Sequence, residues 1–108
     1  MNQLTVEEIR ETGRTILQIA GPVNSYTFTD FQEKIFKAVR RSDIVVDMEK
    51  VTTLSSAGLG VLMAAMEDAE GAGRKIWILR PSEIVRLAIE STGFSDRFPV
   101  AQSMKDLA

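Results

Sequence analysis

The sequence of 108 residues contains no cysteine and no histidine. Without cysteine, the chain can form neither a disulfide nor a thiolate metal site. Without histidine, it lacks the commonest general base, the commonest metal ligand and any Ser–His or Cys–His nucleophilic pair. We therefore expect a protein that is not an enzyme, with no catalytic residue, no bound metal and no cofactor.

A strong charge of one sign and a long apolar run are also missing. The net charge of −2 gives no electrostatic case for binding nucleic acid or an anionic membrane, both of which favour basic patches. No apolar run approaches the roughly 18 residues of a membrane span, and the charged residues near the start do not fit a signal peptide. We expect one domain over residues 1–108, located in the cytoplasm, with no membrane insertion and no nucleic-acid partner.

The apolar pattern alternates between strand and helix periods along the chain. It predicts strands over residues 4–9, 14–20, 43–47, 75–79 and 98–100, and helices after residues 24–27, over 56–71, from Ser82 to a stop at Gly93, and over 103–108. Gly21-Pro22 is expected to end the second strand. This order, β, β, α, β, α, β, α, β, α, predicts an α/β domain with a mixed sheet of four to five strands and helices packed against it.

The predicted helix over residues 56–71 has an apolar face. Leu59, Leu62, Met63 and Met66 fall at i, i+3, i+4 and i+7, the spacing of residues that pack against a sheet. We therefore expect Met63 and Met66 to fill the core. Trp77, in the apolar strand that follows, is expected to belong to the core and not to a ligand platform.

Three carboxylates, Glu67, Asp68 and Glu70, cluster near the end of that helix. Paired carboxylates can carry acid/base chemistry or bind a metal, but no further ligand type stands nearby in the sequence. Carboxylates are mostly exposed in proteins. We therefore expect these three to be solvated.

The loop before the helix carries two adjacent serines and two glycines, Ser55-Ser56-Ala57-Gly58-Leu59-Gly60. A serine at a helix start caps orphan N–H groups, and the same N–H groups also suit a phosphoryl group. Three enzyme motifs do not fit this loop. A dinucleotide-binding motif needs a glycine where Met63 stands, and a P-loop needs Lys-Ser or Lys-Thr where Val61-Leu62 stands. A nucleophile elbow needs a glycine where Leu54 stands.

Gly58 and Gly60 lower helix propensity by up to about 1 kcal/mol each, so their presence in the first turn needs a reason. Two reasons stay open. Either the backbone of a partner protein or of a neighbouring strand approaches them closely, or the helix start packs tightly against its own sheet.

These features together resemble the STAS domain, the family of anti-sigma-factor antagonists. The resemblance rests on a strand ending in Asp47, then residues 51–54 (VTTL) and 55–62 (SSAGLGVL). The family's pattern is an acidic residue, then Ser or Thr, a small residue and Gly-Leu-Gly, and residues 56–60 (SAGLG) fit all of it except the acidic residue. Residues 21–24 (GPVN) are similar to its Gly-x-Leu-Asp turn, and residues 91–94 (STGF) to its Ser-Gly-Leu element. The resemblance covers essentially the whole chain.

The resemblance implies a function in a bacterial partner-switching pathway. Antagonists of this family bind an anti-sigma serine kinase that also sequesters a sigma factor, and this binding releases the sigma factor. The kinase phosphorylates the antagonist on a serine, and a serine phosphatase removes the phosphate. Aligned on Gly-Leu-Gly, that serine is Ser56. The resemblance implies that the partner-binding residues are Asn24, Ser55, Ser56, Ala57, Gly58, Leu59 and Gly60.

Two residues depart from the family pattern. Ser55 replaces the acidic residue before the phosphorylated serine, and Asn24 replaces the acidic end of the first turn. Either the kinase of this protein differs from that of the family, or Ser56 is not phosphorylated and the domain binds its partner constitutively. Ser55 is the alternative residue for phosphorylation. Two other functions stay open: a non-switched scaffold or accessory subunit of a signalling or lipid-transport complex, and nucleotide binding, against which the missing basic phosphate ligands argue.

Overall fold

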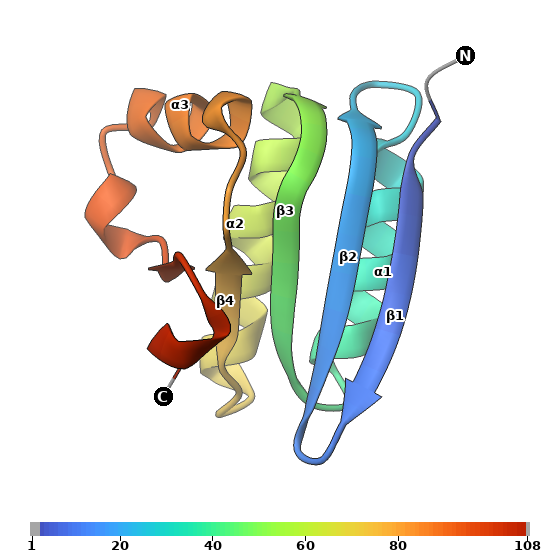
Figure 1. Ribbon diagram of the computed structural model, residues 1–108, viewed down its shortest axis with the longest axis vertical. Coiled ribbons are helices and arrows are strands. Elements are labelled where there is room, and N and C mark those ends of the chain that lie inside the picture. Colours follow the sequence, from blue (N-terminus) through green and yellow to red (C-terminus); the bar gives the residue numbers. More distant parts are fainter. Residues whose placement is uncertain (1–2, 108) are drawn as a thin grey trace.

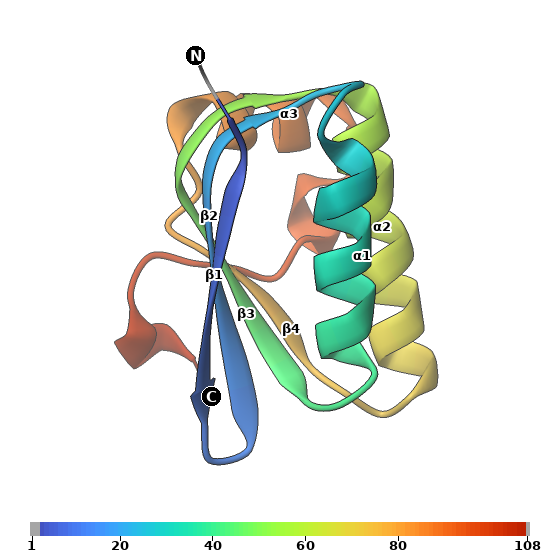
Figure 2. The same ribbon diagram turned by 90° about the vertical axis from the view of Figure 1, so that its right-hand side faces the viewer.

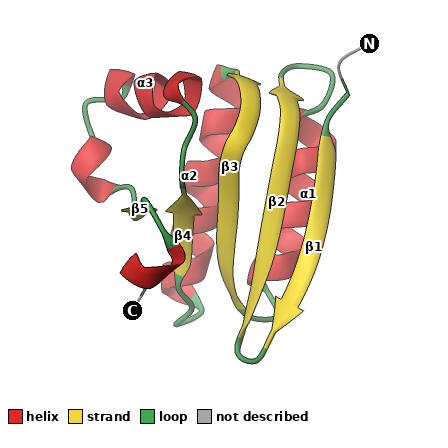
Figure 3. Ribbon diagram, in the orientation of Figure 1, coloured by secondary structure: helices red, strands yellow, loops and turns green. Residues whose placement is uncertain are grey.

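The computed structural model describes residues 3–107. Strands and helices alternate after an opening hairpin (Figure 3). The elements are β1 (Thr5–Glu11), β2 (Arg14–Val23), α1 (Phe28–Val39), β3 (Asp43–Leu54), α2 (Ser56–Gly71), β4 (Ile76–Leu79), α3 (Glu83–Ser91), the 3-10 helix η1 (Ser95–Arg97), β5 (Val100–Ala101) and the 3-10 helix η2 (Met104–Asp106). The predicted α/β class and element order are confirmed.

The five strands form one mixed sheet in the order β1-β2-β3-β4-β5 (Figure 1). β1 and β2 pair antiparallel, whereas β2, β3, β4 and β5 pair in parallel. Parallel neighbours need a crossover connection, and helices supply it. α1 and α2 lie side by side on one face of the sheet, and the C-terminal end of the chain crosses the other face (Figure 2).

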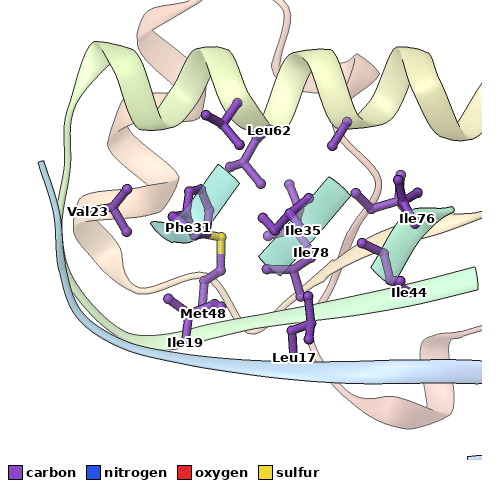
Figure 4. Packing of buried hydrophobic residues seen from close by; sticks show 14 of the residues in the cluster. Leu17, Ile19, Val23, Phe31, Ile35, Ile44, Met48, Leu62, Ile76 and Ile78 are labelled. Carbon is purple, nitrogen blue, oxygen red and sulfur yellow. The ribbon is translucent and has the colours of Figure 1, made fainter. Parts of the chain in front are cut away.

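The main core lies between this sheet and the two long helices. Leu17, Ile44 and Ile78 from three strands meet Ile35 of α1 and Leu62 of α2, all fully buried (Figure 4). Burying a side chain of this size stabilises the fold by about 1.5–3 kcal/mol. α1 is bound through an amphipathic face, because Phe31, Ile35, Ala38 and Val39 are its buried residues.

A smaller cluster covers part of the opposite face of the sheet. Ile16, Val45, Leu79 and Ala101 are buried there, and Trp77, Met104 and Leu107 pack against them. Trp77 is half-buried, so it is a packing residue of this second cluster and does not belong to the main core. The expected short helix at the C-terminus is confirmed as η2, while Ala108 lies outside the described residues.

Two predicted strand ends are wrong. β2 continues through Gly21 and Pro22 to Val23, and β3 continues past Asp47 to Leu54. The register between these strands shifts at two places, after Gln18 and after Gly21. Such bulges let the strand absorb a glycine at φ +96 and a proline without ending.

The predicted inner face of α2 is also wrong in part. Leu62 is buried, but Val61 and Ala65 lie beside it in the core, whereas Met63 is 39% exposed. Leu59 and Met66 are half-buried at the edge of the core. The helix is therefore rotated so that small residues approach the sheet and Met63 faces outward.

The last strand is also displaced from its prediction. β5 consists of Val100 and Ala101, paired with β4 at the sheet edge, and Pro99 precedes it. No helix within residues 3–107 is long and apolar enough to cross a membrane.

Candidate functional site

The start of α2 is held by Ser55, which is the N-cap residue. Its backbone N–H donates to the carbonyl of Val23 at 2.8 Å, and its Oγ accepts a bond from the backbone N–H of Gly58 at 3.2 Å. The first intrahelical bond runs from Leu59 N–H to the carbonyl of Ser55 at 2.9 Å. Ser55 is half-buried, so its hydroxyl is committed to the fold.

Ser56 is the first residue of α2 and is exposed. Within residues 3–107, its hydroxyl takes part in no hydrogen bond, in contrast to that of Ser55. Two serines that are neighbours in the sequence therefore have different environments. Ser55 closes the helix end, and Ser56 presents a free hydroxyl to solvent.

The end of α2 around Ser56 is electropositive. The first four backbone N–H groups of a helix have no intrahelical partner. In α2 these belong to residues 55–58. Ser55 and Gly58 donate the hydrogen bonds given above, so the N–H groups of Ser56 and Ala57 remain for a ligand or solvent. Both residues are exposed, and the first turn contains no acidic side chain. The unopposed N–H groups and the helix dipole favour an added negative charge at this position.

The two glycines of the loop have different surroundings. A Cβ at Gly58 would lie 2.5 Å from Val23 Cγ1 and 2.9 Å from Leu54 Cδ1, so this glycine lets the helix start pack on its own sheet. A Cβ at Gly60 would meet nothing within 4 Å, and Gly60 is exposed. Packing therefore explains Gly58, and it does not explain Gly60.

Asn24 lies in the β2–α1 loop beside this site. The bond between Ser55 and Val23 joins the two loops at the same end of the sheet, the upper end in Figure 1. Asn24 Oδ1 accepts bonds from the backbone N–H groups of Tyr26 at 2.8 Å and Thr27 at 3.2 Å. The structure thus brings Asn24 and the serine loop together, with the Asn24 side chain used to fix its own turn.

Not every expected binding residue is available to a partner. Ala57 and Gly60 are exposed, whereas Gly58 is buried and Leu59 is half-buried against the core. Tyr26, which the sequence did not single out, is 93% exposed in the neighbouring loop. The sequence did contain a signal for Tyr26 as a binding residue: it is an aromatic residue among polar capping residues, and tyrosine is enriched at binding hot spots.

The hollows of about 400 and 450 Å³ that residues 3–107 form are not lined by any of residues 51–60. Glu67, Asp68 and Glu70 are exposed, as expected, and residues 3–107 contain no cluster of three or more side chains that could hold a metal ion.

Comparison with known families decides the classification. The model of the STAS domain matches residues 3–107. The chain belongs to the STAS family. The predicted family and its fold are thereby confirmed.

Solved structures share the fold at low sequence identity. An anti-sigma factor antagonist from Mycobacterium paratuberculosis is 24% identical in sequence, with a TM-score of 0.85. The match covers 96% of this chain and 90% of that protein's chain. The anti-sigma factor antagonist SpoIIAA in its unphosphorylated form is 18% identical with a TM-score of 0.75, covering 95% and 91%. SpoIIAA of Bacillus in the phosphorylated form is 17% identical with a TM-score of 0.71, covering 95% of each chain.

Proposed function

We propose that this STAS domain is an anti-sigma-factor antagonist that binds an anti-sigma serine kinase and is switched off by phosphorylation of Ser56. The observation that carries the proposal is the exposed residue Ser56, whose hydroxyl has no hydrogen-bond partner among residues 3–107, beside a helix cap formed by Ser55. A kinase needs a hydroxyl that it can reach without unfolding the helix. Ser56 meets this requirement, and Ser55 does not.

Phosphorylation would change the surface while leaving the fold intact. It would add a charge of about −1.5 to −2 where the first turn has no acidic residue. The N–H groups of Ser56 and Ala57 and the helix dipole would stabilise that charge within the domain. A partner packed on Ala57 and Gly60 would instead meet a bulky dianion, so binding would fail by obstruction.

A relative of the same fold supports this mode of control. SpoIIAA, an anti-sigma factor antagonist, has been solved in phosphorylated and unphosphorylated forms. Both forms resemble this chain over nearly its whole length, which is what a switch without a change of fold requires.

The neutral residues Asn24 and Ser55 favour a second candidate function. Both stand where the family pattern has acidic residues, so a kinase that recognises those charges would not recognise this loop. A non-switched scaffold or accessory subunit would bind its partner through the same surface without modification. In that case a charge at position 56 would still obstruct binding, but no phosphate would be found there.

The binding test uses the anti-sigma-type serine kinase encoded nearest to this chain in its genome. We expect the Ser56→Ala variant to bind as the wild type does, and the Ser56→Asp variant to bind at least about tenfold more weakly, which is about 1.4 kcal/mol. Titration calorimetry measures both affinities.

The control is Thr12→Asp in the β1–β2 turn, at the opposite end of the sheet (Figure 1). Thr12 is exposed and its side chain forms no hydrogen bond within residues 3–107, so this variant adds the same charge with little effect on the fold. Equal binding by Ser56→Asp and Ser56→Ala would refute the switch.

A further inference from the structure

A groove runs between α2 and the segment that contains η1. It has a volume of about 450 Å³, and its apolar lining comes from Met63, Met66, Phe94 and Phe98. In Figure 2 this segment lies at the level of the helices, on the far side of α2 from the viewer. α1 packs against α2, so the groove follows the flank of α2 that α1 does not cover.

The groove exposes apolar surface that the fold does not bury. Met63 is 39% exposed and Phe94 is 52% exposed. Methionine and phenylalanine around one hollow form a surface that adapts to apolar side chains of different shapes. Isolated exposed apolar residues are ordinary, but these two belong to the same groove.

This groove continues the surface assigned to partner binding. Ser56, Gly60, Met63 and Glu67 are exposed at i, i+4, i+7 and i+11 of α2, the spacing of one helical face. At a rise of about 1.5 Å per residue, Met63 lies about 10 Å along the helix from Ser56. A protein seated on Ser56 would therefore reach the groove.

The rim of the groove is mostly acidic. Glu67 and Glu70 line it, and neither forms an ion pair with any of residues 3–107. They lie towards the negative end of the helix dipole, and the last turn of α2 contains no basic residue. Arg97 also lines the groove, with its guanidinium 6.0 Å from the ring centroid of Phe94.

We infer that the groove receives a segment of the kinase that carries a large apolar side chain flanked by lysine or arginine. The apolar side chain would enter between Met63 and Phe94, and the basic residues would pair with Glu67 and Glu70. This inference rests on the proposed function and names the chemistry of the partner at a second contact of the same interface.

The first arm of the test measures kinase binding by a charge-reversed groove. The Glu67→Lys/Glu70→Lys variant is expected to bind the kinase at least about tenfold more weakly than the wild type. The matched control, Glu7→Lys/Glu33→Lys, makes the same change in net charge at exposed residues of β1 and α1 and is expected to bind within about twofold. Equal binding by the two variants overturns the groove inference.

The second arm does not depend on the kinase. A synthetic amphipathic peptide of leucine and lysine is titrated into protein with labelled methionine methyl groups, and a leucine–glutamate peptide of the same pattern serves as the comparison. We expect the lysine peptide alone to shift the signals of Met63 and Met66, while those of Met48 in the core and Met104 on the opposite face of the sheet stay unchanged. The shifts should disappear in the Glu67→Lys/Glu70→Lys variant.

The two arms separate the two proposals. If the kinase binds neither the wild type nor Ser56→Ala, the proposed function fails, and the peptide titration still decides whether the groove selects basic amphipathic segments. Absence of shifts at Met63 and Met66, or equal shifts with both peptides, overturns the inference. Shifts that depend on protein concentration without peptide would show that a second copy of the chain occupies the groove, which also overturns it.

Discussion

Two helices of this domain begin in the same way and differ in what their serines are free to do. At α3, Ser82 accepts a bond from the N–H of Val85 at 3.4 Å and donates to the carbonyl of Val51 at 2.8 Å. At α2, the Ser55 hydroxyl accepts from the N–H of Gly58, and the next residue, Ser56, adds a second hydroxyl that forms no hydrogen bond within residues 3–107. The Ser82 hydroxyl at the α3 start joins two elements of the fold, whereas the α2 start has one hydroxyl that caps the helix and a second, at Ser56, that is exposed.

The difference supports the proposal that the α2 start is a partner-binding surface. A helix start that only caps its helix needs one hydroxyl. The α2 start has a second hydroxyl, an open glycine at Gly60 and an unopposed dipole. Within residues 3–107, the Ser56 hydroxyl forms no hydrogen bond and Gly60 makes no close contact that a Cβ would disturb, which supports the proposed interaction with a partner.

The largest expected effect contrasts the two glycines of α2. Gly58→Ala should lower the free energy of unfolding by about 1–3 kcal/mol, because the new Cβ overlaps the buried Val23 side chain. Gly60→Ala should raise it by up to about 1 kcal/mol, because alanine favours the helix and meets no neighbour. Urea unfolding of both variants measures the difference. Equal effects of the two substitutions would contradict the packing described here.

The next effect is at the α3 cap. Ser82→Ala should lower the free energy of unfolding by about 1–2 kcal/mol, since it removes a cap and the bond to the carbonyl of Val51. Ser82→Thr, which keeps a hydroxyl that can cap, is the matched control. A loss of the same size in both variants would indicate that shape, and not hydrogen bonding, matters at this position.

A smaller effect separates the two serines of α2. Ser55→Ala should lower the free energy of unfolding by about 0.5–1 kcal/mol, while Ser56→Ala should change it by less than about 0.5 kcal/mol. Ser55→Asp retains a capping oxygen and should match the wild type. The assignment of roles would be reversed if Ser56→Ala proved to be the more destabilising of the two alanine variants.

The smallest effect is remote from this surface and depends on pH. The hydrogen bond from Arg10, at 2.8 Å, lowers the pKa of Glu8 below its ordinary value of 4.5, assisted by the charges of Arg10, Arg41 and Lys37 and opposed by burial. A lowered carboxyl pKa stabilises the fold above the unfolded-state value, and this contribution is lost as pH falls through the folded-state pKa. Glu8→Gln should therefore be slightly less stable than the wild type at neutral pH.

The stability difference between wild type and Glu8→Gln should shrink as the pH falls below 4.5. Thermal unfolding over a pH series measures it. A difference that is constant with pH would show that the Arg10 bond does not depend on the charge of Glu8.

The sequence predicted the elements well because their signals are local. The helix over 56–71, the stop at Gly93 and the alternation of strands and helices follow from periodicity and turn residues near each element. The strand ends at Gly21–Pro22 and Asp47 were wrong because bulges between β2 and β3 absorb residues that would break an isolated strand.

The candidate site was predictable in part. The motif located the serine loop, but the separate roles of Ser55 and Ser56 depend on which residue caps the helix, and this is fixed by the bond from Ser55 to Val23 in another strand. Met63 was wrongly expected in the core, because the spacing of apolar residues alone does not determine which way α2 is rotated about its axis. The contact of Gly58 with Val23 is a tertiary feature that brings α2 close to the sheet. The groove at Phe94 depends on the same placement.

The central claim is that Ser56, and not its neighbour, is the switch. Its most direct test is incubation of the wild type, Ser56→Ala and Ser55→Asp with the anti-sigma kinase and ATP, followed by mass-spectrometric mapping of the phosphate. We predict one phosphate on Ser56 in the wild type and in Ser55→Asp, and none in Ser56→Ala. A phosphate on Ser55, or no phosphate in a wild-type protein that binds the kinase, would contradict the claim.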